Sequence, residues 1–382
     1  MVLYIALSTP AEEQVTREIS LTFVSRFQQL AKGFRRLHPN VVVQLSLYPQ
    51  DQLLRQVRKR SLSGLGPDLI VTTADGANAL LHHHLTRPMP LSRDNASEIA
   101  PLLLHRVTSA NGQISALPLA LYTQLACFDR RRVPQPPTTV RQLLALSADG
   151  VRVGMALQLR DLFWTAGSLG AVPALLAAAE QRDPNPRERQ GLLTWMQWLQ
   201  SANIQRSVTF QAQQTELREG LSRGHFDWIS CNSSDLPLLR SALGPHLGVS
   251  NLPRGEGGDA TPVNVLRVMA LGINSSGAQR EMAIALSRYS LRPLVQRNIA
   301  LESQVFLPVN RHVTMPVESS GTLATLEAAG RQGENAAALL ARLHAADPRV
   351  AQLEQVLVAL VFGSIEPEQA LASTLTILHH PR

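Results

Sequence analysis

The chain has 382 residues and a formal net charge of +7, with 45% hydrophobic and 17% charged residues. This length can bury about two domain cores, and the composition excludes a disordered chain. The sequence contains no run of ~20 apolar residues, which excludes a predicted transmembrane helix. Its basic residues are scattered, without helix-turn-helix or zinc-finger spacing, and this favours a solvated basic surface over a nucleic-acid site.

Strands and helices alternate in the first part of the chain. Residues 2–7, 41–47 and 69–72 are short apolar runs typical of strands, whereas residues 23–34 and 51–62 carry apolar side chains at helical spacing. Such alternation predicts a mostly parallel sheet flanked by helices.

A longer uncharged run follows at residues 114–128. It is too long for one sheet layer and is broken by Pro118, so we interpret it as a strand that crosses from one lobe to another. The Pro-rich loop at 134–137 ends it. Thr138 and Thr139, which precede a Leu-rich run, predict the start of a helix.

The second half of the chain repeats the alternation. Strands are expected at 151–156, 226–231 and 265–273, and the last of these returns to the first lobe. Residues 308–310 look like a third crossing, and residues 314 to the end are rich in Ala and Leu, as in helices.

Six segments, taken in order, resemble a known family. They are residues 34–45, 66–75, 114–144, 247–258, 269–274 and 306–310. Their motifs, such as Gly66-Pro-Asp-Leu-Ile and Leu247-Gly-Val-Ser-Asn-Leu-Pro, resemble those of extracellular solute-binding protein family 1 of ABC importers, the maltodextrin- and sugar-binding type. The resemblance implies an α/β, two-lobed periplasmic-binding-protein-like fold. Each lobe would hold a mostly parallel sheet flanked by helices, with a ligand cleft between the lobes.

The two lobes implied by this resemblance are discontinuous. Lobe one would comprise residues 1–120 plus 262–308, and lobe two residues 121–261 plus 309–382. The crossings near 118–124, 260–266 and 307–312 would act as hinges.

Ligands of open α/β sheets bind outside the carboxyl ends of strands. In lobe one this rule selects Ser8, Thr9, Thr73 and Asp75 as ligand-binding candidates. The resemblance adds Tyr122 and Gln124 in the crossing strand, where the family's residues reach the ligand, and Asn264 near the second crossing is a further candidate. Asp75 falls where the family places a carboxylate that accepts hydrogen bonds from sugar hydroxyls, and a helix N-cap is its alternative role. Tyr122 and Gln124 lie in an apolar strand, where they contact either the ligand or ordinary buried partners.

The same rule applied to lobe two selects Arg160, Asp161, Trp164, Asn232 and Asp235. Trp164 offers a wide apolar face for a sugar ring, and packing in the core is its alternative role. The loop at residues 232–235 lacks the Trp that maltodextrin binders usually carry there. This departure predicts a smaller, more polar ligand than a long oligosaccharide.

Other chemistry has little support. Residues 82–84 are three histidines, but neighbouring helical side chains diverge too far to share one tetrahedral ion. The sequence has no P-loop, G-x-S-x-G or H-E-x-x-H motif, so we expect no catalytic residue, metal or cofactor. The two cysteines, Cys127 and Cys231, allow one bond between them, and we expect two buried thiols instead.

The resemblance implies a function in transport. The protein would be the substrate-binding component of an ABC transporter, which captures a small neutral sugar, glycoside or sugar-like osmolyte by lobe closure and delivers it to a membrane permease. It would be a monomer in the periplasm, with the export signal removed from this sequence. The alternatives are a two-lobed transferase-like enzyme and a ligand sensor without a role in transport.

Overall fold

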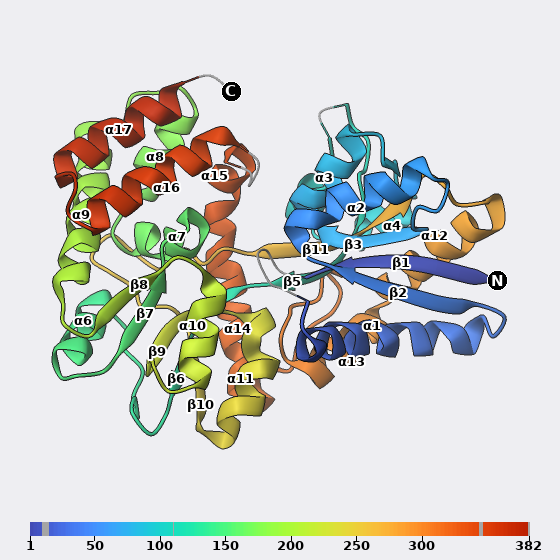
Figure 1. The fold of residues 1–382 in the computed structure, drawn as a ribbon, viewed down its shortest axis with the longest axis horizontal. Coiled ribbons are helices and arrows are strands. Elements are labelled where there is room, and N and C mark those ends of the chain that lie inside the picture. The colour runs from blue at the N-terminus through green and yellow to red at the C-terminus, as the bar shows by residue number, and fades with distance from the viewer. Residues whose placement is uncertain (10–14, 110, 344–346, 381–382) are drawn as a thin grey trace. The chain divides into compact units, whose positions relative to one another are not determined.

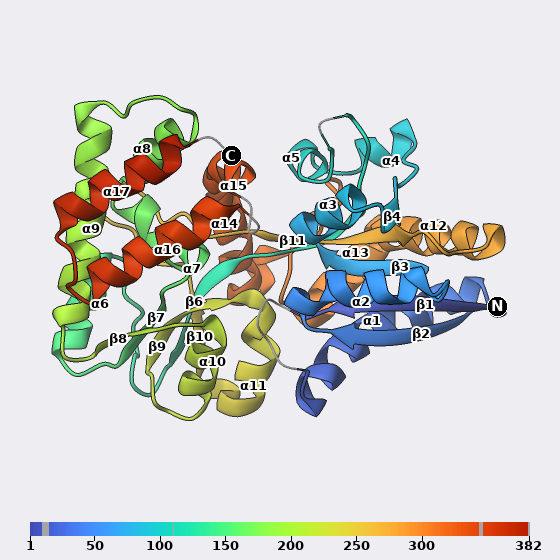
Figure 2. The ribbon, with the colours of Figure 1, turned by 45° about the horizontal axis from the view of Figure 1, so that its top comes forward.

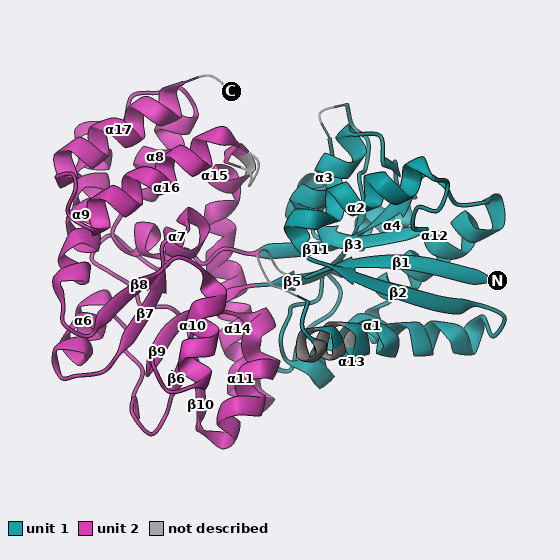
Figure 3. Cartoon of the chain, in the orientation of Figure 1, with its two compact units in different colours: residues 1–122, 265–316 teal, residues 123–264, 317–382 magenta. Residues whose placement is uncertain are grey.

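The computed structural model describes residues 1–9, 15–109, 111–343 and 347–380 (Figure 1). The chain forms two compact units, each built from two separate segments (Figure 3). Unit 1 comprises Met1–Tyr122 and Val265–Pro316, and unit 2 comprises Thr123–Asn264 and Val317–Arg382. The chain therefore passes between the units at 122–123, 264–265 and 316–317. These passages fall two, three and eight residues after the expected boundaries at 120–121, 261–262 and 308–309.

The sheet of unit 1 has the strand order β2-β1-β3-β11-β4, and β5 also pairs with β11. Its strands are β1 (Val2–Ser8), β2 (Val42–Tyr48), β3 (Leu69–Thr73), β4 (Thr86–Arg87), β5 (Leu117–Tyr122) and β11 (Val265–Gly272). β1 runs parallel to β2 and β3, whereas β11 runs antiparallel to β3, β4 and β5. The sheet is therefore mixed and not mostly parallel as expected, because the strand that returns from unit 2 enters it in the opposite direction.

Helices cover both faces of this sheet. They are α1 (Arg17–Leu37), α2 (Gln50–Leu62), α3 (Ala74–His82), α4 (Arg93–Ser97), α5 (Pro101–His105), α12 (Gly277–Leu291) and α13 (Pro293–Ser303). Within unit 1, α2 and α3 lie above the sheet in Figure 1 and α1 lies below it. α12 contacts α1 and α13, so these three helices form one layer. Figure 2 gives a second view of both layers. Fully buried strand residues such as Ile5 and Ile70 form the core between them.

The sheet of unit 2 has the strand order β10-β6-β9-β7-β8. Its strands are β6 (Gln124–Asp129), β7 (Val153–Ala156), β8 (Val208–Gln211), β9 (Trp228–Asn232) and β10 (Leu247–Ser250). β7 runs parallel to β8 and β9, and β6 runs antiparallel to β9 and β10. In this sheet too, the antiparallel pairs involve the strand that arrives from the other unit.

The helices of unit 2 come from both of its segments. They are α6 (Val140–Ala148), α7 (Leu159–Ser168), α8 (Val172–Ala179), α9 (Pro186–Ile204), α10 (Gln214–Ser222), α11 (Leu236–Leu243), α14 (Gly321–Gln332), α15 (Ala337–Arg342), α16 (Pro348–Val361) and α17 (Pro367–His379). α16 and α17 pack on α9, and α14 packs on β6 and β10. Thr139 is the N-cap of α6 and forms a capping box with Gln142, which confirms the helix start expected there.

The uncharged run at residues 114–128 forms two strands instead of one. Only Thr123 separates β5, which pairs with β11, from β6, which pairs with β9 and β10. The run is long because each half is buried in a different sheet.

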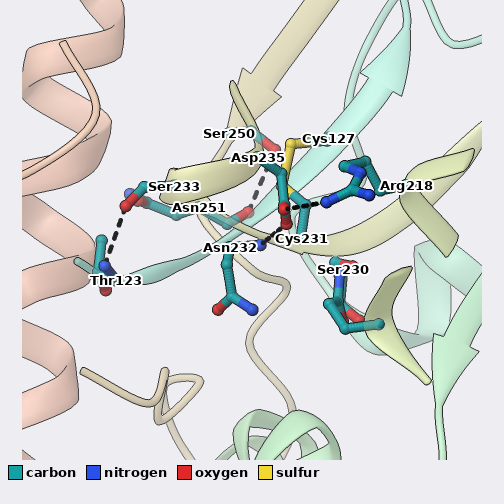
Figure 4. The surroundings of a disulfide bond; sticks show 11 residues. Thr123, Cys127, Arg218, Ser230, Cys231, Asn232, Ser233, Asp235, Ser250 and Asn251 are labelled. Atoms are coloured by element: carbon teal, nitrogen blue, oxygen red, sulfur yellow. Dashed lines mark hydrogen bonds and ion pairs between the residues drawn. A yellow bond between two sulfur atoms is a disulfide. The ribbon is translucent and has the colours of Figure 1, made fainter. Parts of the chain in front are cut away.

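A disulfide between Cys127 and Cys231 links β6 to β9 (Figure 4). The expectation of two buried thiols is therefore wrong. Pairing of the two strands brings the cysteine Cα atoms to 5.8 Å, within the range that a disulfide spans. The cysteines are 104 residues apart in the chain, and nothing in the sequence marks their strands as neighbours.

We expect this disulfide to stabilise unit 2 mainly by restricting its unfolded chain. Replacing both cysteines by alanine should lower the free energy of unfolding by about 2–5 kcal/mol, as for the loss of other native disulfides that close long loops. Urea unfolding followed by circular dichroism measures the change. Wild-type protein in reducing buffer is the control and should resemble the double variant. A double variant as stable as the oxidised wild type would contradict the expectation.

Candidate functional site

The carboxyl ends of three strands of unit 1 meet at one edge of its sheet. β1 and β3 are parallel, and β5 runs in the same direction because both β3 and β5 are antiparallel to β11. Ser8, Thr73 and Tyr122 are the last residues of these strands. The strand-end rule thus brings candidates from three parts of the sequence to one edge.

Ser8, the last residue of β1, and Thr9, which follows it, are fully buried. The Ser8 hydroxyl donates to Thr72 Oγ1 at 3.4 Å and accepts from Arg267 Nη1 at 3.0 Å. The Thr9 amide donates to the Tyr48 carbonyl at 2.9 Å. Ser8 and Thr9 therefore contribute internal hydrogen bonds that hold the edge together.

Thr73 and Asp75 lie at the N-terminus of α3. Thr73 is the N-cap, and its Oγ1 accepts from the Gly76 amide at 3.1 Å. The N-cap role considered for Asp75 is therefore filled by Thr73, while Asp75 lies half-buried in the first helical turn. A carboxylate is favoured there by the helix dipole. Since a capping hydroxyl still has its proton to donate, the pair offers one hydroxyl donor and one charged acceptor.

A pocket of about 90 Å³ opens in unit 1 on the face covered by α1, α12 and α13. Tyr122 and Ser8 both line it, together with Arg267. Its remaining lining is mostly apolar and includes Phe27, Leu30, Leu119, Ile299 and Phe306. The Tyr122 ring packs near that of Phe306, with centroids 5.7 Å apart.

The sequence analysis did not select Arg267, although it is the charged group of this pocket. It sits inside the apolar strand Val265–Gly272, and a cation within such a run is the signal that could have marked it. Desolvation lowers the pKa of Arg267 to about 10, partly offset by Tyr122, so the guanidinium remains charged at neutral pH.

In unit 2, Gln124 and Asp161 are brought together. Gln124 is buried, and its Nε2 donates to the Asp161 carbonyl oxygen at 2.8 Å. Its Oε1 accepts from the Val263 amide at 3.5 Å. The side chain thus ties β6 to the start of α7 and to the segment that leads into β11, which corresponds to the buried hydrogen-bonding role. Asp161 is itself buried, whereas Arg160 beside it in the first turn of α7 is half-buried.

Asn232 and Asp235 surround the turn after β9. Asp235 is buried, and its carboxylate accepts from the Asn232 amide at 3.0 Å and lies 3.5 Å from Nη1 of the buried Arg218. In Figure 4 the Asn232 side chain points away from the disulfide and from this ion pair. Asp235 therefore holds the turn through the backbone amide of Asn232, and the Asn232 side chain is half-buried.

Asn264 also has a structural role. Its Nδ2 donates to the Gly330 carbonyl at 2.8 Å, near the end of α14. A Cβ on Gly333 would come within 2.6 Å of the Asn264 amide, so this amide fills the space beside the helix end.

Trp164 lies in the core of unit 2 and has no exposed surface. Its ring is 6.2 Å from that of Trp228, which is equally buried. The expectation that Trp164 stacks on a ligand is not supported by this position, because α7 directs the ring into the core and not outward. Packing in the core, the alternative considered for this residue, describes it.

Among the described residues, no group of three His, Cys, Asp or Glu side chains is placed to bind a metal. His82 ends α3, and its ring meets the His83 ring edge to face. Nor does any helix in the described ranges combine the length and the apolar character needed to cross a bilayer.

No protein-family model matches the sequence, and no curated protein matches it either. Solved structures do match it over almost their whole length. The GacH receptor of Streptomyces glaucescens, solved unliganded and with acarbose, is 14% identical, with a TM-score of 0.74 over 98% of this chain and 97% of that one. The maltose-maltodextrin binding protein of Alicyclobacillus acidocaldarius is 16% identical, with a TM-score of 0.70 and full coverage of both chains.

A third match is an ABC transporter solute-binding protein of Thermotoga lettingae bound with α-D-tagatose, with 14% identity, a TM-score of 0.69 and 99% coverage of both chains. These likenesses confirm the fold expected from the sequence. The chain has the two-lobed α/β fold of solute-binding proteins, with two sheets flanked by helices.

The position of Trp164 predicts a stability defect in its variants. Trp164→Ala should destabilise the protein by about 3–5 kcal/mol, because it leaves a cavity in the core. Trp164→Phe should cost less, since it keeps most of the apolar volume. Chemical unfolding measures both variants, and ligand titration of the folded Trp164→Phe protein completes the test. Unchanged stability together with lost ligand binding would contradict the core role.

Proposed function

We propose that this protein is the substrate-binding component of an ABC transporter, and that it captures a small neutral sugar, glycoside or sugar-like osmolyte. The observation that carries the proposal is the likeness of the fold, over nearly complete chains, to proteins solved with acarbose or tagatose or named for maltose and maltodextrin. The fold does not identify the ligand. We infer the class of ligand from the polar side chains at the strand ends.

The half-buried polar candidates suit hydroxyl groups. Asp75 provides a charged acceptor, and hydrogen bonds to a charged acceptor are about twice as strong as neutral ones. Thr73 adds a hydroxyl donor, while Asn232 and Arg160 add an amide and a guanidinium from unit 2. A polyol that both donates and accepts hydrogen bonds complements this set.

The tryptophans favour a small ligand. Trp164, Trp195 and Trp228 are buried, and Trp198 is half-buried against the core of unit 2. Three of the four tryptophans therefore have no face for a sugar, and the fourth is packed in part against the core, which leaves little ring surface on which a long sugar chain could stack. We infer recognition by hydrogen bonding, which suits a small polar molecule.

Capture and delivery complete the proposal. The two units would close on the ligand, and a membrane permease would then receive it from the closed form. A disulfide between two strands is typical of proteins in oxidising compartments, and this supports a place in the periplasm or outside the cell. We propose that the protein acts as a monomer, without an enzymatic step.

Removing the charge of Asp75 tests the ligand class. Asp75→Asn keeps the shape of the side chain but replaces a charged acceptor by a neutral one, and it should weaken binding of a neutral sugar by about 1–2 kcal/mol. Calorimetric titration measures the affinity, which should change little with salt because no ion pair forms with the ligand. Asp51→Asn, in the first turn of α2, removes the same charge from a helix N-terminus and should leave binding unchanged.

The opposite outcome would count against a neutral ligand. A phosphorylated or carboxylated sugar that binds tightly, loses affinity with salt and gains affinity in Asp75→Asn would overturn this part of the proposal.

Closure of the units predicts a more compact protein with ligand. Small-angle X-ray scattering should give a smaller radius of gyration in a saturating sugar than without it. A sugar that produces no heat of binding should leave the radius unchanged and serves as the control. An unchanged radius under saturating ligand would argue against closure.

A further inference from the structure

Among the described residues, Arg267 is a cation without an acidic partner. Its guanidinium donates to the Ser8 carbonyl at 2.6 Å, to Ser8 Oγ at 3.0 Å and to the Val71 carbonyl at 3.3 Å, and all three acceptors are neutral. No Asp or Glu in the described part of the chain forms an ion pair with it. Arg267 is half-buried, and since even partial removal of a charge from water is costly unless the charge is paired, this position favours an external anion.

The buried arginines of unit 2 differ from Arg267, because each forms an ion pair with an aspartate. Arg218 pairs with Asp235, and Arg349 pairs with Asp347 at 2.7 Å. Where this chain buries an arginine in unit 2, it supplies a carboxylate. In unit 1 the guanidinium of Arg267 instead lines a pocket.

The rest of the pocket lining is apolar except for a few polar side chains. Phe27, Leu30, Leu119, Ile299 and Phe306 give it largely apolar walls. The polar side chain of Gln296 is fully engaged, because its Nε2 donates to the Leu119 and Ser290 carbonyls and its Oε1 accepts from the Val309 amide. Tyr122 also lines the pocket, and its hydroxyl forms no hydrogen bond with another described residue.

We propose that unit 1 binds a small carboxylic acid with an apolar tail in this pocket. The carboxylate would accept hydrogen bonds from Arg267 and from the Tyr122 hydroxyl, and the tail would lie against the apolar walls. This site goes beyond the proposed sugar function. It lies on the face of the sheet covered by α1, α12 and α13, whereas Asp75 belongs to α3 on the other face.

Size and lining argue against other occupants. A volume of about 90 Å³ admits a short chain or a small group and no segment of another protein. A sugar would bury its hydroxyls against apolar side chains with few partners, which is costly. A phosphate dianion would meet one guanidinium and one hydroxyl, too few donors for its oxygens.

Calorimetric titration at pH 7 with acetate, butanoate and hexanoate tests the proposal, with 1-hexanol as the neutral counterpart of hexanoate. We expect saturable binding of hexanoate, weaker binding of the shorter acids and no saturable binding of hexanol. Affinity should rise up to about fourfold for each methylene group that enters the pocket, as expected for buried apolar surface. The assay does not depend on sugar binding, so it is informative even if the proposed function fails.

Variants assign the contacts. Arg267→Gln and Tyr122→Phe should each weaken hexanoate binding by about tenfold or more, as expected for the loss of a hydrogen bond to a charged carboxylate. Arg297→Gln removes an exposed positive charge from α13 and should leave affinity unchanged, as the matched control. Ile299→Phe places a larger side chain in the pocket at a half-buried position and leaves Arg267 in place, so it should abolish binding. This variant tests the site even if Arg267→Gln does not fold.

Three outcomes would overturn the proposal. They are no saturable binding of any acid in the series, equal affinity for hexanol and hexanoate, and full hexanoate affinity in a folded Ile299→Phe variant.

Discussion

The passage of the chain through Thr123 is the constraint on which the rest of the structure depends. One residue separates a strand of one sheet from a strand of the other, so both sheets are anchored to the same stretch of backbone. The passage is fixed on the side of unit 2, where the Thr123 amide donates to Ser233 Oγ at 3.1 Å and its carbonyl accepts from the Ser233 amide at 2.8 Å (Figure 4). Tyr122 and Gln124 flank it, and they belong to different sheets with different roles.

The polar candidates of the two units divide into two groups by their burial. Gln124, Asp235 and Asn264 are buried and satisfied within unit 2, where they hold strand ends, a turn and a helix end in place. Thr73, Asp75, Arg160 and Asn232 are half-buried at the ends of strands or the starts of helices. Buried polar groups must be satisfied internally to avoid a desolvation penalty. Within unit 2, Gln124 therefore fixes the start of α7, which carries Arg160, and Asp235 fixes the turn that begins at Asn232.

The sequence predicted the alternation of strands and helices, the strand ends and the fold, because apolar periodicity and helix caps are local signals. It failed where distant segments meet. The Cys127–Cys231 bond depends on the pairing of β6 with β9, and the burial of Trp164 depends on Trp228 lying across the core. Arg267 was missed because its three described acceptors, two carbonyls and one hydroxyl, come from β1 and β3, and only the folded chain brings these strands beside β11. The sheets are mixed because the strands that cross between the units run antiparallel to their neighbours. The spacing of apolar residues predicts a strand but not its direction in the sheet.

Thermal unfolding against a panel of neutral monosaccharides, disaccharides and glycosides tests the central claim most directly, with matched phosphorylated and carboxylated sugars in the same panel. A ligand that binds only the folded state raises its stability by RT ln(1 + [L]/Kd), about 2.7 kcal/mol at a concentration of 100 Kd. The account predicts that at least one neutral sugar or glycoside raises the midpoint of unfolding in a saturable way and that its charged counterpart does not. A panel in which no neutral sugar stabilises the protein would contradict it.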